Sequence, residues 1–271
     1  MTDITKRIGT AERFRLLLGG LSVSVFLIIW QIAPETGLVS SAAVSAPYDV
    51  MLEAARLIRS GELVDNIAIS MGRILSGLFL AIGAAVPLGF LLGGQFRIAG
   101  KAVNPLLQLF SWTNPFAMLP VFITVLGLGE VSRVVMIFWV AVWPVLFGTI
   151  TGIGNADREL VKMSHSFGLS KAQMFEKVLL PGALPSVFSG IRVAALFSFF
   201  VLIGAEMIGA GSGLGYMINN ACPLHSAHQL DKMWAGIVTV AMLGVLINWV
   251  ITGIERRFSY RKEDGRQKEH Q

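Results

Sequence analysis

The sequence predicts an all-α membrane protein with six transmembrane helices. Of its 271 residues, 54% are hydrophobic and only 14% are charged, which is too apolar for a soluble domain of this length. A helix needs about 20 mostly apolar residues to cross the hydrocarbon core of a bilayer. Six segments qualify, and they cover residues 16–33, 74–94, 103–128, 131–153, 190–210 and 234–254. We expect residues 1–271 to form a single transmembrane domain.

The basic residues sort onto one side of these spans. With an even number of spans both termini share a side, and seventeen of the 22 Lys and Arg residues lie on that side. They are found at the termini, in the segment 155–185, and at Arg97, Lys101 and Arg192. The positive-inside rule therefore predicts that both termini and the segment 155–185 are cytoplasmic. The lipid bilayer is expected to surround the apolar spans. The basic C-terminal run is expected to contact anionic lipid, so the net charge of +5 does not indicate nucleic-acid binding.

Three further features limit the possibilities. Cys222 is the only cysteine, which excludes an intrachain disulfide and a thiolate metal cluster. His225 and His228 have a spacing that could hold a metal on one helical face, but two ligands without a third predict no metal site. The basic N-terminus lacks a small-residue cleavage site after its apolar run, so 16–33 is expected to be retained as a span. Residues 47–60 have the apolar spacing of an amphipathic helix at the outer surface, and the commoner alternative is a simple linker helix.

The second span carries small residues at every fourth position. Gly77, Ala81, Ala85, Gly89 and Gly93 form a ridge along one face. Such a ridge lets another helix approach closely in lipid, where no hydrophobic effect drives association. It predicts a packing seam, either within the subunit or between subunits.

The third span is interrupted near its middle. Ser111-Trp112-Thr113-Asn114-Pro115 puts polar groups and a helix breaker at membrane depth, where freed backbone is tolerated if protein or a water-filled cavity satisfies it. Broken helices line the pathways of many carriers, so Ser111, Thr113 and Asn114 are the first candidates for a translocation pathway. The alternative is a kink sealed by neighbouring helices.

Phe197 and Phe200 in the fifth span are the best candidates for a gate, although packing is the commoner role.

Two charged residues are expected to pair within the membrane. Glu206 is the only acidic residue of the fifth span and lies near its outer end, and Arg73 enters the second span from the same side. Because an intramembrane ionisable group usually faces protein and has a partner, we predict an Arg73 to Glu206 ion pair. The alternative is a carboxylate at the water boundary.

The polar segment 155–185 predicts two short helices joined at a glycine. Asn155 can cap the first helix, whose Leu160, Met163 and Phe167 share one face. Gly168 ends it in a left-handed conformation. Ser170 and Gln173 have capping-box spacing, so a second helix should run from Lys171 and stop ahead of Pro181 and Pro185.

Gly168, nine residues and then Val178-Leu179-Leu180-Pro181 resemble the cytoplasmic loop of the permease subunits of binding-protein-dependent ABC importers. Further motifs are similar to the nitrate, sulfonate and taurine branch of that family; they are Leu-Pro-Gly-Ala-Leu-Pro at 180–185, Gly190-Ile191-Arg192, Ala205-Glu206-Met207 and Gly213-Leu214-Gly215-Tyr216. The similarity covers residues 47–258. It departs from the family at Lys162-Met163-Ser164, where Glu-Ala-Ala is usual, so the polar contacts of docking are left open.

The resemblance implies a subunit that does not hydrolyse ATP. In the family the loop docks on a separate ATPase, which holds ATP and Mg, so the chain itself should bind no cofactor. The residues that it implies for ATPase coupling are Leu160, Lys162, Met163, His165, Phe167, Gly168, Val178, Leu180 and Pro181. The other implied partners are a periplasmic solute-binding protein and a second permease copy, in a bacterial inner membrane. The implied cargo is a small anion such as nitrate, a sulfonate, taurine or bicarbonate.

The motifs of catalysis are missing from the sequence. Gly94 to Lys101 approaches a phosphate-binding loop but has one residue too many and continues with Ala102, which lacks the hydroxyl that binds magnesium. No Ser/His/Asp or His-Glu-x-x-His arrangement is present. Two alternatives to an importer permease stay open. A secondary carrier would normally have midplane acids or an inverted repeat, and a membrane enzyme or scaffold is disfavoured because no catalytic set is present.

Overall fold

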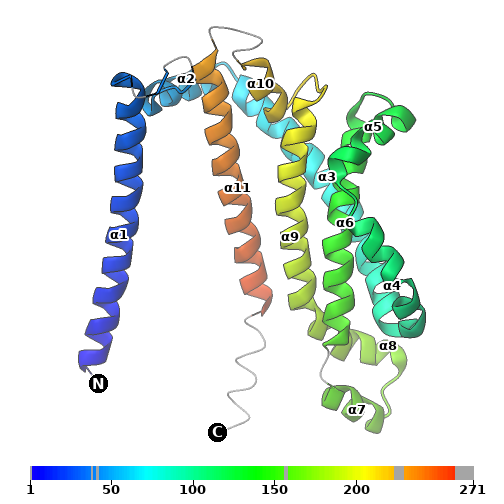
Figure 1. Cartoon of the computed structure of the whole chain (residues 1–271). Coiled ribbons are helices and arrows are strands. Elements are labelled where there is room, and N and C mark those ends of the chain that lie inside the picture. The colour runs from blue at the N-terminus through cyan, green and yellow to red at the C-terminus, as the bar shows by residue number, and fades with distance from the viewer. Residues whose placement is uncertain (1, 38, 41–42, 156–157, 223–228, 260–271) are drawn as a thin grey trace. The chain divides into compact units, whose positions relative to one another are not determined.

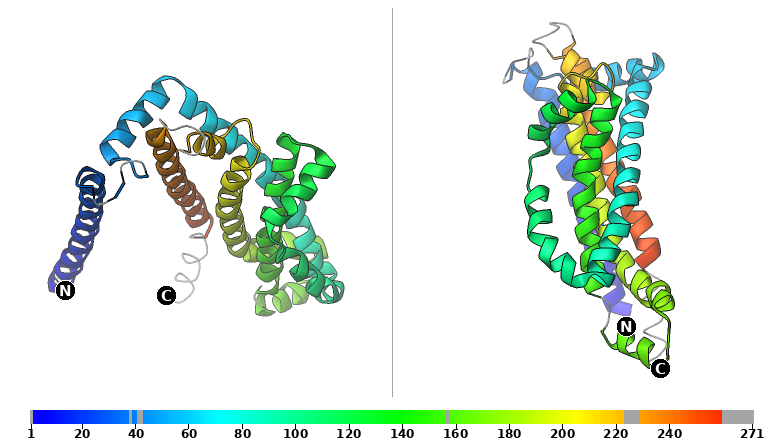
Figure 2. Two further views of the ribbon diagram at one scale, coloured as in Figure 1. Left: turned by 45° about the horizontal axis from the view of Figure 1, so that its top comes forward. Right: turned by 90° about the vertical axis from the view of Figure 1, so that its right-hand side faces the viewer.

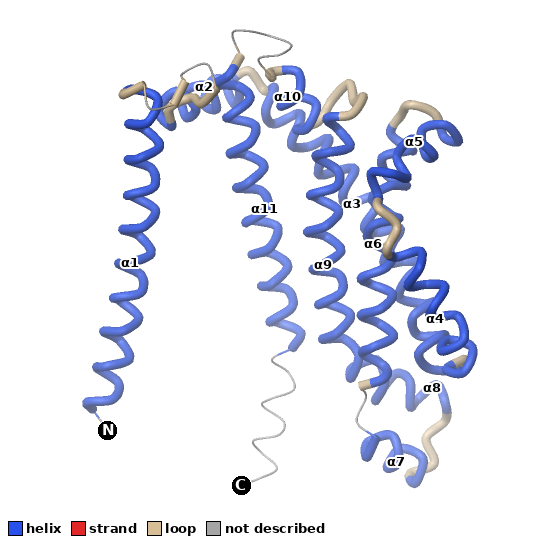
Figure 3. The backbone as a smooth tube through the Cα atoms, in the orientation of Figure 1, coloured by secondary structure: helices blue, strands red, loops and turns tan. Residues whose placement is uncertain are grey.

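The described part of the computed structural model is helical and contains no strand (Figure 1, Figure 3). The structure describes residues 2–37, 39–40, 43–155, 158–222 and 229–259. The helices are α1 (Thr2–Glu35), α2 (Pro47–Arg59), α3 (Glu62–Phe90), the π-helix η1 (Leu91–Gln95), α4 (Arg97–Ser111), α5 (Pro115–Leu126), α6 (Glu130–Gly154), α7 (Arg158–Ser166), α8 (Lys171–Met174), the π-helix η2 (Phe175–Leu179), α9 (Leu180–Met207), α10 (Leu214–Asn220) and α11 (Leu230–Ser259).

Five of the described helical segments are long and apolar enough to cross a membrane. The sixth predicted span, 103–128, is two helices, α4 and α5, bent by 87° at the break that the sequence predicts (Figure 2). The count is therefore six if the bent pair forms one span. The observed helices begin before the predicted limits, most clearly α1, which begins at Thr2, and α3, which begins at Glu62. A helix can continue through polar residues at its ends because its hydrogen bonds are made by the backbone.

Contacts divide the chain into two compact units, Met1–Val64 with Met217–Val238 and Asp65–Tyr216 with Thr239–Gln271. The prediction of one domain over residues 1–271 stays a prediction. In the first unit, the rings of Trp30 and Trp234 lie 5.6 Å apart, and their indole nitrogens donate to the carbonyls of Ser45 and Ala43. The predicted surface helix is α2, which buries Val50 and Leu57.

The second unit is built around α6, which packs against α3 on one side and α9 on the other. The small-residue ridge of α3 is the seam with α6: a Cβ added at Gly77 would meet the side chain of Ile137, and one added at Gly89 would meet that of Thr149. Ala81 and Ala85 are fully buried in the same seam. The ridge is thus a contact within the subunit, which answers the alternative left open by the sequence.

The seam between α6 and α9 also depends on small residues. A Cβ added at Gly148 would lie 2.8 Å from the carbonyl oxygen of Ser186, and one added at Gly190 would lie 2.6 Å from that of Pro144. Ala194 and Ser198, which follow Gly190 at four-residue intervals on α9, are fully buried. In lipid, where no hydrophobic effect drives helix association, this close backbone approach lets van der Waals contacts hold α9 against α6.

Candidate functional site

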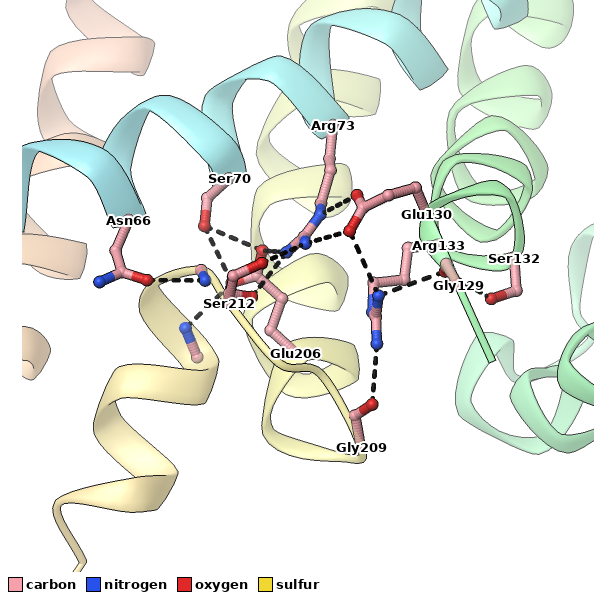
Figure 4. A network of polar contacts seen from close by, with 12 residues as sticks. Asn66, Ser70, Arg73, Gly129, Glu130, Ser132, Arg133, Glu206, Gly209 and Ser212 are labelled. Atoms are coloured by element: carbon pink, nitrogen blue, oxygen red, sulfur yellow. Dashed lines mark hydrogen bonds and ion pairs between the residues drawn. The ribbon is translucent and has the colours of Figure 1, made fainter. Parts of the chain in front are cut away.

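Two regions of the second unit contain most of the candidate functional residues, and they lie at the two ends of α9. At the Met207 end is a network of charged and polar side chains, which we call the ionic network; it consists of Asn66, Ser70, Arg73, Glu130, Arg133, Glu206 and Ser212 (Figure 4). At the Leu180 end is the loop formed by α7, Gly168, α8 and η2, which we call the coupling loop.

Arg73 is the centre of the ionic network. Its side chain is 3% exposed, and each of its five N–H bonds has an acceptor. Nη1 donates to Glu206 at 2.6 Å and to the Ser212 carbonyl at 2.8 Å. Nη2 donates to the Ser212 hydroxyl at 2.9 Å and to Glu130 at 2.5 Å, and Nε donates to Glu130 at 2.6 Å. A buried guanidinium costs little free energy only when it is paired in this way.

Glu206 is the completely buried anion of the network, with a side-chain exposure of 0%. Besides Arg73, its carboxylate accepts from the Ser70 hydroxyl at 2.9 Å and from the backbone N–H of Gly215 at 3.0 Å. The structure thus brings together the two residues that the sequence predicts as a pair. The alternative of a carboxylate at the water boundary does not fit this burial.

The loop after α9 is folded over Glu206 and held by α3. Asn66 accepts from the N–H of Gly213 at 2.7 Å, and Ser70 accepts from the N–H of Leu214 at 3.0 Å. Gly213 has φ +109°, and a Cβ there would collide with the Glu206 carboxylate. Glycine is therefore required at 213 by both backbone conformation and space.

Glu130 and Arg133, at the start of α6, form the exposed edge of the network. The Glu130 side chain is 62% exposed although it makes two hydrogen bonds to Arg73. Arg133 lies 3.6 Å from the same carboxylate and donates to the Gly209 carbonyl at 2.8 Å. The two arginines and two glutamates balance in charge, but only one of the glutamates is enclosed.

The sequence interpretation missed most of this network. Asn66 and Ser70 are spaced at i and i+4 with the predicted Arg73 at i+7, so the three share one face of an apolar helix, and that pattern could have identified Asn66 and Ser70. Glu130 and Arg133 were overlooked because charged residues at the start of a span are typical of the membrane boundary.

The coupling loop has the predicted turn at Gly168. This residue has φ +68°, the N–H of Leu169 bonds to the carbonyl of Ser164, and together they form a Schellman-type end to α7. The predicted capping box is present: the Ser170 N–H donates to the Gln173 side chain at 3.0 Å, and the Gln173 N–H donates to the Ser170 hydroxyl at 3.3 Å.

The predicted apolar face of the loop is exposed. Leu160 is 47%, Met163 is 54% and Phe167 is 82% exposed. Lys162 is exposed as well, and the side chain of His165 lies outside the described residues. The other end of the loop is anchored, because the ring of Phe175 packs edge-on against that of Phe90 at 4.8 Å between centroids.

Two predictions about the loop are wrong. Asn155 does not cap α7; its N–H bonds to the last turn of α6, so it is the C-cap of that helix. The second helix does not stop ahead of Pro181. The chain passes through η2, where the N–H of Leu180 bonds to the carbonyl of Phe175, and continues into α9. Pro181 stands in the first turn of α9, where its missing N–H leaves no bond unmade. Val178 and Leu180 are half-buried at this junction.

The remaining candidates lie at the break and on α9. Asn114 caps α5 by accepting from the N–H of Phe116 at 2.9 Å, and Ser111 donates to the carbonyl of Gln108 at 2.8 Å. Thr113 lies between them in the loop. Phe197 and Phe200 are 59% and 80% exposed, so neither is packed within the described chain. His225 and His228 lie outside the described residues.

Comparison with known proteins identifies the family. Residues 85–260 match the model of the binding-protein-dependent transport system inner membrane component. The chain is 32% identical over 246 residues to the SsuC permease of Bacillus subtilis, named for aliphatic sulfonates transport, with 91% of this chain and 88% of that protein covered. It is 27% identical to the taurine transport system permease TauC of Escherichia coli, with 88% and 87% covered, and 28% identical to the nitrate import permease NrtB of Leptolyngbya laminosa, with 94% and 88% covered.

A solved structure supports the fold. An inward-facing conformation of the MetNI methionine ABC transporter matches 74% of this chain and 97% of its own, with a TM-score of 0.62 and 18% identity. Together with the family match, the shared architecture is that of a type I importer permease. The chain belongs to the binding-protein-dependent transport system inner membrane components, the permease subunits of ABC importers.

Proposed function

We propose that this permease carries a small anion, such as nitrate, a sulfonate, taurine or bicarbonate, from a periplasmic binding protein through the bacterial inner membrane. The names of the related SsuC, TauC and NrtB permeases support this class of cargo. Two copies of the chain would form the pathway, with Ser111, Thr113 and Asn114 lining it and Phe197 and Phe200 at its gate. The chain itself would bind no cofactor, and ATP with Mg would be bound by separate ATPase subunits.

The observation that carries the proposal is the exposed apolar face of the coupling loop. Exposing Leu160, Met163 and Phe167 to water would cost free energy, and no lipid would cover them on a short polar helix outside the bilayer. A helix with such an exposed apolar face is expected to dock into a groove, here on an ATPase subunit. Since η2 leads into α9 without a break, movement of the loop would be passed to that helix.

The proposal is tested by purifying the full-length chain from its host in mild detergent. We expect an ATPase subunit to co-purify and its ATP hydrolysis to rise when the solute-loaded binding protein is added. Uptake into vesicles should require ATP. Uptake driven by an ion gradient, with no ATPase attached, would establish a secondary carrier instead.

The orientation is tested at Cys222, which follows α10 and is a free thiol. If both termini and the coupling loop are cytoplasmic, Cys222 is extracytoplasmic. We expect a membrane-impermeant maleimide to label Cys222 once the outer membrane is permeable and the inner membrane is intact. Labelling only after the inner membrane is opened would reverse the orientation.

A further inference from the structure

The ionic network contains one carboxylate that the rest of the network does not enclose. Glu206 and Arg73 are 0% and 3% exposed, whereas the Glu130 side chain is 62% exposed. Glu206 has three donors around it, the Ser70 hydroxyl, Nη1 of Arg73 and the N–H of Gly215, and cannot leave without breaking the fold of the loop that covers it. Glu130 is bound only through its two oxygens, by the side chains of Arg73 and Arg133.

The donors that face Glu130 form a defined arrangement. Nε and Nη2 of Arg73 are a side-on fork, with both nitrogens within 2.6 Å of the two carboxylate oxygens. Nη1 of Arg133 lies 3.6 Å from one of them. A guanidinium fork of this kind matches any planar pair of oxygens, in a carboxylate or in another oxyanion.

Both arginines are held in place without Glu130. Arg73 keeps its bonds to Glu206 and to both oxygens of Ser212. Arg133 keeps its bonds to the carbonyls of Gly129 and Gly209. If Glu130 swings away, the donors therefore stay aimed at the position of its carboxylate, and two positive charges face one buried negative charge.

We propose that the position of the Glu130 carboxylate is a binding site for the oxyanion that the transporter imports, and that Glu130 occupies it as an internal substitute when no solute is present. Arg73 would bind two oxygens of a sulfonate, nitrate or bicarbonate, and Arg133 would contact one of them. Competition with a tethered carboxylate keeps binding weak, as a site of passage requires, since a solute held tightly there would not move on. This inference rests on the proposed function for the identity of the solute.

The test is the thermal unfolding of Glu130→Ala in the full-length chain in nanodiscs. Removing the internal carboxylate leaves two arginines with one buried glutamate between them, so we expect a lower unfolding midpoint in chloride. Nitrate or methanesulfonate at the same ionic strength should raise the midpoint by roughly 3 °C or more, which is what near-saturation of a site gives in a chain of this size. The wild type should respond less because Glu130 competes.

Glu62→Ala is the matched control. It also removes a half-exposed carboxylate from a cation, since Glu62 lies 2.6 Å from Nζ of Lys232, but a lone ammonium offers no fork. Glu130→Asp serves if the alanine variant does not fold, because it keeps the charge while withdrawing the carboxylate from the fork; the oxyanions should stabilise it more than they stabilise the wild type. Equal stabilisation of Glu62→Ala and Glu130→Ala, or no preference over chloride, would overturn the site.

Failure of this inference and failure of the proposed function give different results. If the wild-type complex hydrolyses ATP and imports an anion while the oxyanions do not stabilise Glu130→Ala or Glu130→Asp, the site is wrong and the function stands. If the oxyanions stabilise these variants while the complex imports an uncharged solute, the anion site stands and the proposed cargo is wrong.

Discussion

The two ends of α9 differ in how far their side chains are buried and bonded within the chain. At the Met207 end, Arg73 and Glu206 are buried and each of their polar groups is bonded within the chain. At the Leu180 end, the coupling loop exposes Met163 and Phe167 and is anchored through Phe175. The ends are separated by a continuous helix of 28 residues, about 42 Å long. The buried pair of the ionic network is satisfied within the chain, whereas the apolar face of the loop is left exposed by the described part of the chain.

The largest effect should come from Glu206→Gln. It removes a charge that Arg73 needs inside the protein, and breaking a buried pair commonly costs about 3–5 kcal/mol of folding free energy. Glu53→Gln is the control, since its contact with Arg56 is 3.6 Å long and the arginine is 81% exposed; it should cost less than about 1 kcal/mol. Unfolding in a titration with denaturing detergent measures both. Equal stability of the two variants would mean that the ionic network does not brace α9.

Two glycines with positive φ allow the same comparison at the level of the backbone. Gly168 in the coupling loop has φ +68° and open space around its Cα, so Gly168→Ala should cost about 1 kcal/mol for the backbone alone. Gly213 has φ +109° and the Glu206 carboxylate where a Cβ would be, so Gly213→Ala should cost about 2–3 kcal/mol. Unfolding midpoints of the two variants test the order, and a reversed order would show that the loop over Glu206 can move aside.

The difference between the ends also explains what the sequence could predict. A charge inside an apolar segment needs a partner, so Arg73 and Glu206 could be paired without a structure. Glu130 and Arg133 could not be placed in the network from the sequence, because charged residues at the start of a span are commonly exposed to water at the membrane boundary. The turn at Gly168 and the capping box at Ser170 and Gln173 follow from local chemistry and are present.

The error at Pro181 has a different cause. The rule that a helix ends before proline assumes that the chain stays α-helical, and it does not foresee that the π-helical turn η2 places Pro181 in a first turn where no N–H is needed. Likewise, the α3 ridge of small residues predicts close packing but does not name the neighbouring helix, which only the structure identifies as α6.

The smallest effect on folding should accompany the largest effect on assembly. Phe167 is 82% exposed, so Phe167→Ala should change the stability of the isolated chain by less than about 0.5 kcal/mol. If the ring is buried in an ATPase groove, the same truncation should weaken association by about 2 kcal/mol, roughly 30-fold. Phe79→Ala is the control, because Phe79 is 70% exposed on α3 and belongs to an apolar span rather than to the loop. We expect detergent-purified Phe79→Ala to keep its ATPase and Phe167→Ala to lose it, together with hydrolysis stimulated by the binding protein. Retention of the ATPase by both variants would show that the exposed face of the loop is not the docking surface, and the contrast between the two ends of α9 would then lose its functional meaning.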